Sequence, residues 1–188
     1  PGRYNLLNST AAIVASYHLG VDLPKLQAGL KAYQGSLRRF EFIGRVKGIS
    51  LYDDYAHHPT EIKATLTGAK DKFPDSKIIC VFQPHQTKRL KLLFRDITES
   101  FNDADILILL PPYQVAGRDN DDLQYNSEAL FKAIQKKSPK KEIYYLQSPA
   151  NLKKIIEEKV ISRKLLVKKF VLIMMGAGNI ADLTEKLI

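Results

Sequence analysis

Acidic and histidine side chains gather in one short stretch of the sequence. Asp53 and Asp54 are followed by His57 and His58. Carboxylates accept hydrogen bonds from sugar hydroxyls, and imidazoles donate to carboxylate or phosphate oxygens. The same residue types ligate zinc or manganese, but adjacent histidines diverge on an extended backbone, and the stretch lacks the i, i+4 spacing of a helical metal pair. The pattern favours polar recognition over a metal site, and a structural role, with Asp54 or Thr60 capping the next helix, stays open.

A second polar cluster follows the apolar run that ends at Phe82. It contains His85, Lys88 and Arg89. Arg89 falls near the start of an expected helix, where the helix dipole already favours anions, and its guanidinium group can bind a carboxylate or a phosphate. An ordinary exposed arginine is the alternative interpretation.

Two earlier points in the chain could also bind a charged or planar ligand. Arg38 and Arg39 form a basic pair, and Asn5 and Asn8 carry amide groups. Such amides pair with the edge of an adenine as well as they cap a helix. No glycine is followed directly by lysine, so the sequence contains no Walker loop to hold phosphates. A complete enzyme driven by a nucleoside triphosphate is therefore not expected within this chain.

The scaffold that must position these residues is predicted by the hydrophobic pattern. The 188 residues, 45% of them hydrophobic and 26% charged, suit one α/β domain or one domain with a piece of a neighbour. Continuous apolar strands between amphipathic helices indicate a mostly parallel, Rossmann-like sheet with helices on both faces. Ligands of such sheets bind at the carboxyl ends of the strands, where His57, His58 and His85 fall. We expect helices over 8–19, from Asp22 to Gly35, and over 59–72, 88–101, 127–137, 149–159 and 177–187, a hairpin over 40–54, and strands over 77–82, 105–110, 142–146 and 169–175.

The formal net charge of +9 comes from one late stretch of the chain. Residues 132–169 hold twelve Lys or Arg and three Glu, and the remaining residues are neutral as a group. A surplus confined to one lysine-rich stretch predicts solvated helix faces rather than a nucleic-acid site.

The apolar residues predict neither a membrane span nor a disulfide. The longest apolar runs fall far short of the about 20 residues that a bilayer crossing requires. The single cysteine, Cys80, lies in an apolar run and is expected to be a small core residue in a reducing compartment. We therefore expect a cytoplasmic protein. The start at Pro1, without a methionine or a leader, indicates a fragment boundary.

Six segments in a fixed order carry a resemblance to a known family. They are Gly2-Arg3-Tyr4-Asn5-Leu6-Leu7-Asn8, Arg38-Arg39-Phe40-Glu41, Asp53-Asp54-Tyr55-Ala56-His57-His58-Pro59-Thr60-Glu61, Phe82-Gln83-Pro84-His85, Ala116-Gly117 and Gly176-Ala177-Gly178-Asn179-Ile180. In this order they resemble the Mur ligases of bacterial peptidoglycan synthesis. The resemblance runs nearly end to end, and the aspartate–histidine segment is its most specific part.

The resemblance implies that the chain is part of a longer protein with three domains. These would be a UDP-binding domain, a central ATPase with the Walker loop, and a C-terminal α/β domain. Residues 1–41 would then be the last helices of the central domain, and residues 42–188 the Mur ligase C-terminal domain. This organisation would explain the missing Walker loop, and we expect the isolated chain to be inactive.

The activity that the resemblance implies is that of an ATP-dependent, amide-forming ligase. Resemblance to the alanine-adding branch implies that L-alanine is joined to the carboxylate of UDP-N-acetylmuramate through an acyl phosphate. ATP and Mg²⁺ would be the cofactors, with the Mg²⁺ ligands in the missing central domain. The partners would be these substrates and the two other domains, with no nucleic acid and no membrane. A ligase that recycles a ready-made tripeptide and a non-catalytic basic binding module are the alternatives.

Particular residues acquire roles through the same resemblance. Asn5 and Asn8 would contact adenine, and Arg39 the terminal phosphates. Asp53 and Asp54 would bind the ribose or its neighbourhood.

The substrate side of the site is implied in the same way. His57, His58, His85 and Arg89 would face the carboxylate of the muramate and the incoming amino acid. Arg39 and His58 would be the catalytic residues.

Three positions depart from the family pattern. They are Gln86, Arg118 and Asn179. We expect them to alter substrate affinity while the adenine, phosphate and ribose contacts are kept.

Overall fold

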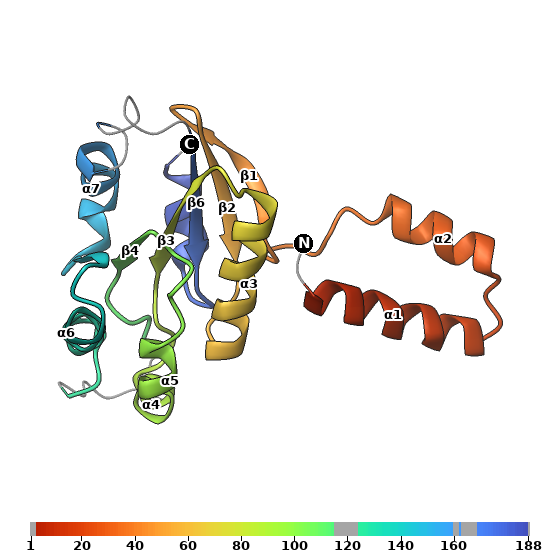
Figure 1. The fold of residues 1–188 in the computed structure, drawn as a ribbon, viewed down its shortest axis with the longest axis horizontal. Helices are drawn as coiled ribbons and strands as arrows, with labels where there is room; N and C mark the ends of the chain where they lie inside the picture. The colour runs from red at the N-terminus through yellow and green to blue at the C-terminus, as the bar shows by residue number, and fades with distance from the viewer. Residues whose placement is uncertain (1–2, 115–123, 160–161, 163–168, 188) are drawn as a thin grey trace.

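The chain forms two parts in the computed structural model, which describes residues 3–114, 124–159, 162 and 169–187. A hairpin of two helices, α1 (Arg3–His18) and α2 (Leu23–Ala32), extends away from an α/β domain (Figure 1). Gly20, at φ +88°, lies in the turn between the helices, in a conformation that favours glycine. Asp22 caps α2. The expected second helix is confirmed.

The α/β domain is built on one sheet. In the described part of the chain, six strands lie in the order β1-β2-β6-β3-β4-β5. β1 pairs antiparallel with β2, and every other pair in this order is parallel. The mostly parallel sheet is therefore confirmed. The strands are β1 (Glu41–Val46), β2 (Ile49–Asp54), β3 (Lys77–Phe82), β4 (Ile106–Leu109), β5 (Glu142–Tyr145) and β6 (Phe170–Met175).

Helices cover both faces of the sheet, as the sequence predicts. One face packs against side chains of α3, α5 and α6, and the other against side chains of α7 and α8. The helices of this domain are α3 (Pro59–Lys72), α4 (Thr87–Leu92), α5 (Phe94–Thr98), α6 (Ser127–Lys137), α7 (Leu152–Lys159) and α8 (Ile180–Glu185), with a 3-10 turn η1 (Pro149–Asn151) before α7.

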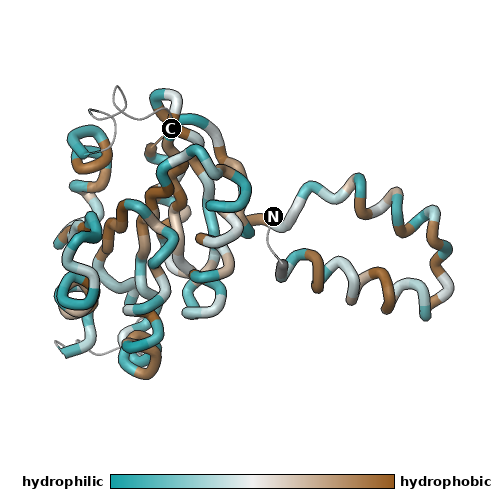
Figure 2. The backbone as a smooth tube through the Cα atoms, viewed as in Figure 1, coloured by the Kyte–Doolittle hydropathy of each residue, from teal (hydrophilic) through white to brown (hydrophobic). Residues whose placement is uncertain are grey.

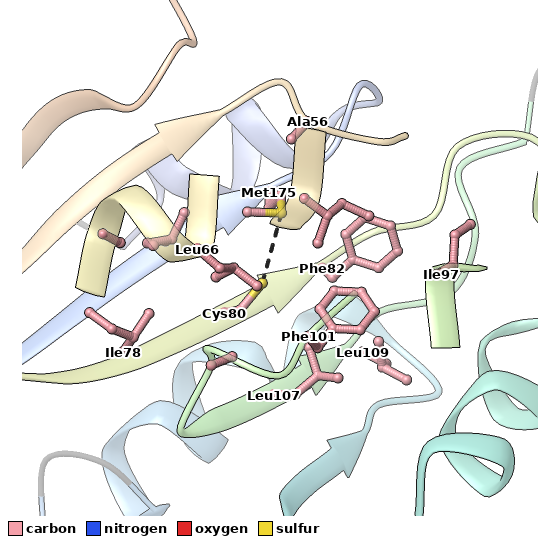
Figure 3. Packing of buried hydrophobic residues seen from close by; sticks show 14 of the residues in the cluster. Ala56, Leu66, Ile78, Cys80, Phe82, Ile97, Phe101, Leu107, Leu109 and Met175 are labelled. Carbon is pink, nitrogen blue, oxygen red and sulfur yellow. Dashed lines mark hydrogen bonds between the residues drawn. The ribbon is translucent and has the colours of Figure 1, made fainter. Parts of the chain in front are cut away.

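The core lies on both sides of the central strands β3 and β6. Cys80 on β3 is fully buried, and its Sγ lies 4.0 Å from the Met175 Sδ on β6 (Figure 3). The rings of Phe82 and Phe101 pack with centroids 5.1 Å apart. Burial raises the pKa of the Cys80 thiol, so it is protonated at neutral pH. The prediction that Cys80 is a core residue is confirmed.

Some expected boundaries are wrong. The first helix begins at Arg3 rather than near Asn8, so Asn8 lies inside α1 and does not cap it. The helix expected over 88–101 is two short helices, because the backbone at Leu93 (φ −109°, ψ 13°) leaves the helical conformation. The apolar pattern continues across this break, so periodicity alone could not reveal it. The last helix, α8, is shorter than expected.

Most of the described lysines of the basic stretch face solvent. Lys132, Lys136, Lys153 and Lys154 are exposed on α6 and α7. Lys141 is an exception, since it is half-buried and its Nζ donates to the backbone carbonyl of Ala104. The prediction of solvated helix faces is confirmed for the exposed lysines. Among the described residues, no helix is long and apolar enough to cross a membrane.

Candidate functional site

The carboxyl ends of the parallel strands bring distant segments of the chain to one edge of the sheet. β6 lies between β2 and β3, although it is the last strand in the sequence. The segments that follow these three strands are residues 55–58, 83–86 and 176–179. The crossover places Gly176 beside Gln83, and Gly178 beside Tyr113. Ligands of open α/β sheets bind at such points.

A row of aromatic rings crosses this edge of the sheet. The ring centroids of Tyr55 and His57 are 5.5 Å apart, and those of His57 and His85 are 6.0 Å apart. His85 in turn stacks on Tyr113, with centroids 5.6 Å apart and an interplanar angle of 13°. A Cβ atom on Gly178 would lie 2.5 Å from Cγ of Tyr113, so glycine is required there. The structure therefore joins two of the predicted substrate residues, His57 and His85, in one row.

Glu61 organises the loop that carries the adjacent histidines. Its Oε2 accepts hydrogen bonds from the backbone N–H groups of His57 and His58, both at 3.2 Å. His57 Nδ1 also lies 3.5 Å from this oxygen and 3.0 Å from the carbonyl oxygen of Tyr55. Burial alone would raise the pKa of Glu61, but these backbone donors and the nearby His57 and Arg39 lower it. Glu61 therefore carries a negative charge at neutral pH.

His58 forms the N-cap of α3. Its Nδ1 accepts a hydrogen bond from the backbone N–H of Thr60 at 3.4 Å, and Glu61 binds back to the His58 backbone. This is a capping box with histidine in place of the usual serine or threonine. The alternative that the sequence left open, in which Asp54 or Thr60 caps this helix, is therefore wrong. The His58 side chain is exposed and lies outside the ring row formed by its neighbour.

Asp54 is buried and binds three groups of the protein. Its Oδ2 accepts from the backbone N–H of Phe40 at 2.8 Å. Its Oδ1 accepts from the backbone N–H of Ala56 at 2.8 Å and from the Thr65 hydroxyl at 3.2 Å. Burial raises the pKa of Asp54, and these donors, together with Arg39, oppose the shift. The carboxylate joins the start of β1 to the end of β2.

Asp53 lies on the opposite face of the sheet from Asp54. Its Oδ2 accepts from the Arg38 Nε at 2.8 Å, and only 4% of the Asp53 side chain is exposed. Successive residues of a strand point to opposite faces, so two adjacent carboxylates on β2 cannot serve one ligand site from the same side. The assignment of both Asp53 and Asp54 to the nucleotide therefore stays a prediction, in which the two carboxylates lie on different faces of the sheet.

A cleft of about 1010 Å³ separates the helical hairpin from α3. Four residues that the sequence assigned to the nucleotide, Asn5, Asn8, Arg39 and Asp54, line it together. The Arg39 side chain is 53% exposed, and its Nη1 lies 3.5 Å from Glu61 Oε1. The structure thus brings two amides, a cation and a carboxylate to one cleft from α1, the linker after α2, and β2.

Two of the lining residues that were not found from the sequence, Tyr4 and Thr65, interact with Asp54. Tyr4 is half-buried at the start of α1, and burial, followed by the nearby Asp54, raises the pKa of its phenol. Thr65 lies on α3 and donates to Asp54. A signal for Thr65 exists, because it follows Glu61 by one helical turn and so shares its face. Tyr4 directly precedes Asn5, but nothing in its spacing marks it.

The remaining predicted positions lie elsewhere. Arg89 is in α4, outside the residues that line the cleft. Gln86 adopts a left-handed backbone (φ +64°) before α4. The Asn179 Oδ1 accepts a hydrogen bond from Gln83 Nε2 at 3.1 Å. Arg118 and the pair Ala116-Gly117 lie outside the described residues.

The described residues contain no cluster of potential metal ligands. Among residues 3–114, 124–159, 162 and 169–187, no three His, Cys, Asp or Glu side chains form a group that could hold an ion. Asp53 and Asp54 diverge, and Asp54 already binds three donors.

The fold and the cleft define a class of protein: a Rossmann-like α/β domain with an attached helical hairpin and a cleft of about 1010 Å³ between the hairpin and α3. The sequence profile of the family described as "Mur ligase, glutamate ligase domain" matches residues 38–178. The chain belongs to this family.

Individual relatives extend the match over nearly the whole chain. A UDP-N-acetylmuramate–L-alanine ligase of Caldanaerobacter subterraneus subsp. tengcongensis is 38% identical over 186 residues, which cover 99% of this chain and 38% of the relative. The crystal structure of UDP-N-acetylmuramate-alanine ligase from Thermotoga maritima has a TM-score of 0.77 and 28% identity, and the match covers 100% of this chain and 37% of that one. A murein peptide ligase from Psychrobacter arcticus has a TM-score of 0.68 and 28% identity, covering 99% and 36%. The chain thus spans less than half the length of these relatives.

Proposed function

We propose that this chain is the C-terminal part of an ATP-dependent ligase that joins L-alanine to UDP-N-acetylmuramate in peptidoglycan precursor synthesis. The observation that carries the proposal is the cleft, where Asn5, Asn8, Arg39 and Asp54 meet. The names of the relatives that match nearly the whole chain support it. A bacterial cytoplasmic location belongs to the proposal.

The proposed domain organisation assigns the hairpin and the α/β domain to different parts of the ligase. Residues 1–41 would be the last helices of a central ATPase domain, and residues 42–188 the C-terminal domain. The family match, which begins at residue 38, supports this division. The cleft would then lie at the junction of two domains, where ligand sites are frequent.

The nucleotide would bind in the cleft with its adenine toward α1. Asn5 and Asn8 can each offer an amide donor and an acceptor to the base edge. Arg39 would contact the terminal phosphates and stabilise the negative charge that moves during phosphoryl transfer. Asp54 would lie near the ribose, although its oxygens also hold the protein backbone. Asp53 would act through Arg38 rather than on the nucleotide.

The acceptor substrate would face the row of rings at the sheet edge. His57 and His85 would bind the muramate carboxylate or the amino acid, and Arg89 and the exposed His58 would reach toward the same substrates from α4 and from the start of α3. These groups orient substrates and offset negative charge, which brings the amine to the acyl phosphate. Mg²⁺ would further neutralise phosphate charge, held by residues of the central domain.

The proposal is tested with the full-length reading frame that contains this chain. ADP release is measured with ATP, Mg²⁺ and UDP-N-acetylmuramate, adding in turn L-alanine or the tripeptide L-alanyl-γ-D-glutamyl-meso-diaminopimelate. We expect release that depends on L-alanine. Release that depends on the tripeptide instead would favour the ligase that recycles a ready-made tripeptide.

The isolated chain is the matched control. We expect it to release no ADP, because its sequence contains no Walker loop. RNA binding that weakens steeply with salt, together with no binding of the nucleotide sugar by the full-length protein, would favour a basic binding module instead.

A further inference from the structure

The linker between α2 and β1 holds Arg39 between two residues with unusual backbone conformations. Arg38 has φ +55° and Phe40 has φ +53°. The left-handed region is unfavourable for residues that carry a Cβ atom. Surrounding contacts must therefore hold both residues in place.

The Arg38 side chain connects the ends of two strands. Its Nε donates to Asp53 Oδ2 at 2.8 Å, and its Nη2 donates to the carbonyl oxygen of Gly176 at 2.7 Å. Asp53 lies at the end of β2, and Gly176 directly follows β6. Only 24% of the Arg38 side chain is exposed. A charged pair that is largely shielded from solvent makes strong, directional hydrogen bonds.

The backbone of Arg38 is held from both sides. Its N–H donates to Glu41 Oε2 at 2.7 Å, and its carbonyl oxygen accepts from the Tyr55 N–H at 2.7 Å. Its guanidinium carbon lies 5.1 Å from the centroid of the Tyr55 ring, a cation–π distance. Arg38 is therefore fixed by side chain and backbone together.

Phe40 fixes the linker on the other side of Arg39. Its N–H donates to Asp54 Oδ2 at 2.8 Å, and its buried ring stacks on Tyr52 with centroids 4.6 Å apart. By contrast, Arg39 makes longer contacts, with Nη1 3.5 Å from Glu61 Oε1 and the guanidinium 5.7 Å from the Tyr55 centroid. The direction of the Arg39 side chain is thus set by its two anchored neighbours.

We propose that Arg38 is a positioning residue for Arg39: its guanidinium clamps the linker onto β2 and β6 and so aims Arg39 into the cleft. The inference rests on the proposed function, in which Arg39 contacts the terminal phosphates of ATP. Arg38 does not itself touch the nucleotide, because its guanidinium is turned toward Asp53 and Gly176. Asp53 acquires a role as the partner of the clamp.

Steady-state kinetics of the full-length enzyme test whether Arg38 acts through Arg39. Arg38→Met removes the guanidinium but keeps a long side chain, and we expect kcat to fall about 10- to 100-fold, the effect of a misplaced catalytic group. The KM for UDP-N-acetylmuramate should stay within about twofold, because that substrate is not bound by Arg39. Arg45→Met, an exposed arginine on β1, is the matched control and should behave as wild type.

The double variant separates positioning from an independent role. If Arg38 acts through Arg39, then Arg38→Met adds little to the loss caused by Arg39→Ala. Losses that multiply in the double variant, or an Arg38→Met enzyme with wild-type kcat, would overturn the proposal. Arg38→Lys keeps the charge but cannot span both acceptors, so its kcat should lie between those of wild type and Arg38→Met.

Amide hydrogen exchange of the 188-residue chain tests the clamp without any enzyme activity. The Tyr55 N–H donates to the Arg38 carbonyl oxygen, and the Phe40 N–H donates to Asp54. Arg38→Met should therefore speed the exchange of both amides at least about 10-fold relative to Arg45→Met. Unchanged exchange at both amides would overturn the clamp even if the ligase is active. Faster exchange in a protein whose full-length form adds no amino acid would refute the proposed function and, with it, the aiming of Arg39 at phosphate.

Discussion

The α/β domain and the helical hairpin use apolar residues in opposite ways. Leu66 on α3 and Leu107 on β4 are fully buried. Leu7 on α1 is 60% exposed, and Leu19 after its end is 85% exposed. Figure 2 shows the same contrast, because hydrophobic residues run along the central strands but alternate with polar ones around the hairpin. Apolar content alone therefore does not tell which segment forms a core.

The contrast indicates that the two parts depend on different partners for stability. The α/β domain covers both faces of its sheet with its own helices. In α2, by contrast, no described residue is buried. Short helices gain most of their stability from packing of an apolar face. We propose that the rest of a central domain covers the hairpin in the complete ligase.

The largest effect that would sharpen this comparison is expected from matched leucine substitutions. Leu66→Ala leaves a cavity in the core and should lower the free energy of unfolding of the chain by about 2–5 kcal/mol. Leu7→Ala, also on a helix, should change it by less than about 0.5 kcal/mol. Urea denaturation of both variants measures the difference. If Leu7→Ala lowered the free energy of unfolding as much as Leu66→Ala does, the contrast between the hairpin and the α/β domain would be wrong.

The same leucine tests the proposed domain organisation. Leu7→Ala should lower the free energy of unfolding more in the full-length protein than in the 188-residue chain, because a central domain would bury that side chain. An unchanged cost would contradict the assignment of residues 1–41 to that domain.

Replacing one glycine by alanine in each part should change the free energy of unfolding in opposite directions. In Gly178→Ala, the new Cβ would lie 2.5 Å from Tyr113 Cγ, so the ring must move, and we expect a loss of about 1–3 kcal/mol. In Gly29→Ala, inside α2, the new Cβ would meet no atom within 4 Å. Because alanine favours the helix, this substitution should raise the free energy of unfolding by at most about 1 kcal/mol. Thermal unfolding of both variants measures the changes. Destabilisation by Gly29→Ala would show that the hairpin is packed more closely than the structure shows.

The smallest effect concerns the pH dependence of Glu61. Its pKa is lowered in the folded chain, so its carboxylate stabilises the fold above the unfolded pKa of about 4.3, and this contribution disappears as the pH falls through the folded pKa. Glu61→Gln should therefore be less stable than wild type at pH 7, with the difference vanishing in acid. The effect should stay below about 1 kcal/mol, because solvent screens a side chain that is 34% exposed.

Denaturation at pH 7 and in acid measures this difference. Glu158→Gln, an exposed glutamate on α7, controls for the loss of one charge. A Glu61→Gln difference that grows in acid would mean that the carboxylate does not hold the loop of His57 and His58.

Most elements of the α/β domain follow from local sequence signals. The bounds of α3, α6 and β3 match the expected ones, because a capping site or Pro begins each helix and a continuous apolar run forms the strand. The break at Leu93 is not marked by Gly or Pro, so the sequence predicted one helix there. The position of β6 between β2 and β3 is a long-range property that local signals do not contain.

The resemblance singled out a set of candidate residues, but the sequence did not predict how these residues are arranged. The sequence identified Asn5, Asn8, Arg39 and Asp54, and the structure gathers them in one cleft. The sequence could not show that Asp53 forms an ion pair with Arg38. That contact depends on a linker in which Arg38 and Phe40, neither of them glycine, adopt left-handed backbone conformations. Strained conformations are set by tertiary contacts, which a single sequence does not reveal.

L-Alanine-dependent ADP release by full-length Arg39→Ala protein tests most directly whether the cleft is the nucleotide site of an alanine ligase. We predict a loss in kcat of at least about 100-fold, the usual cost of removing a group that stabilises transition-state charge. Arg45→Ala, measured beside it, should retain the wild-type rate. A wild-type kcat for Arg39→Ala would contradict the assignment of the cleft to ATP.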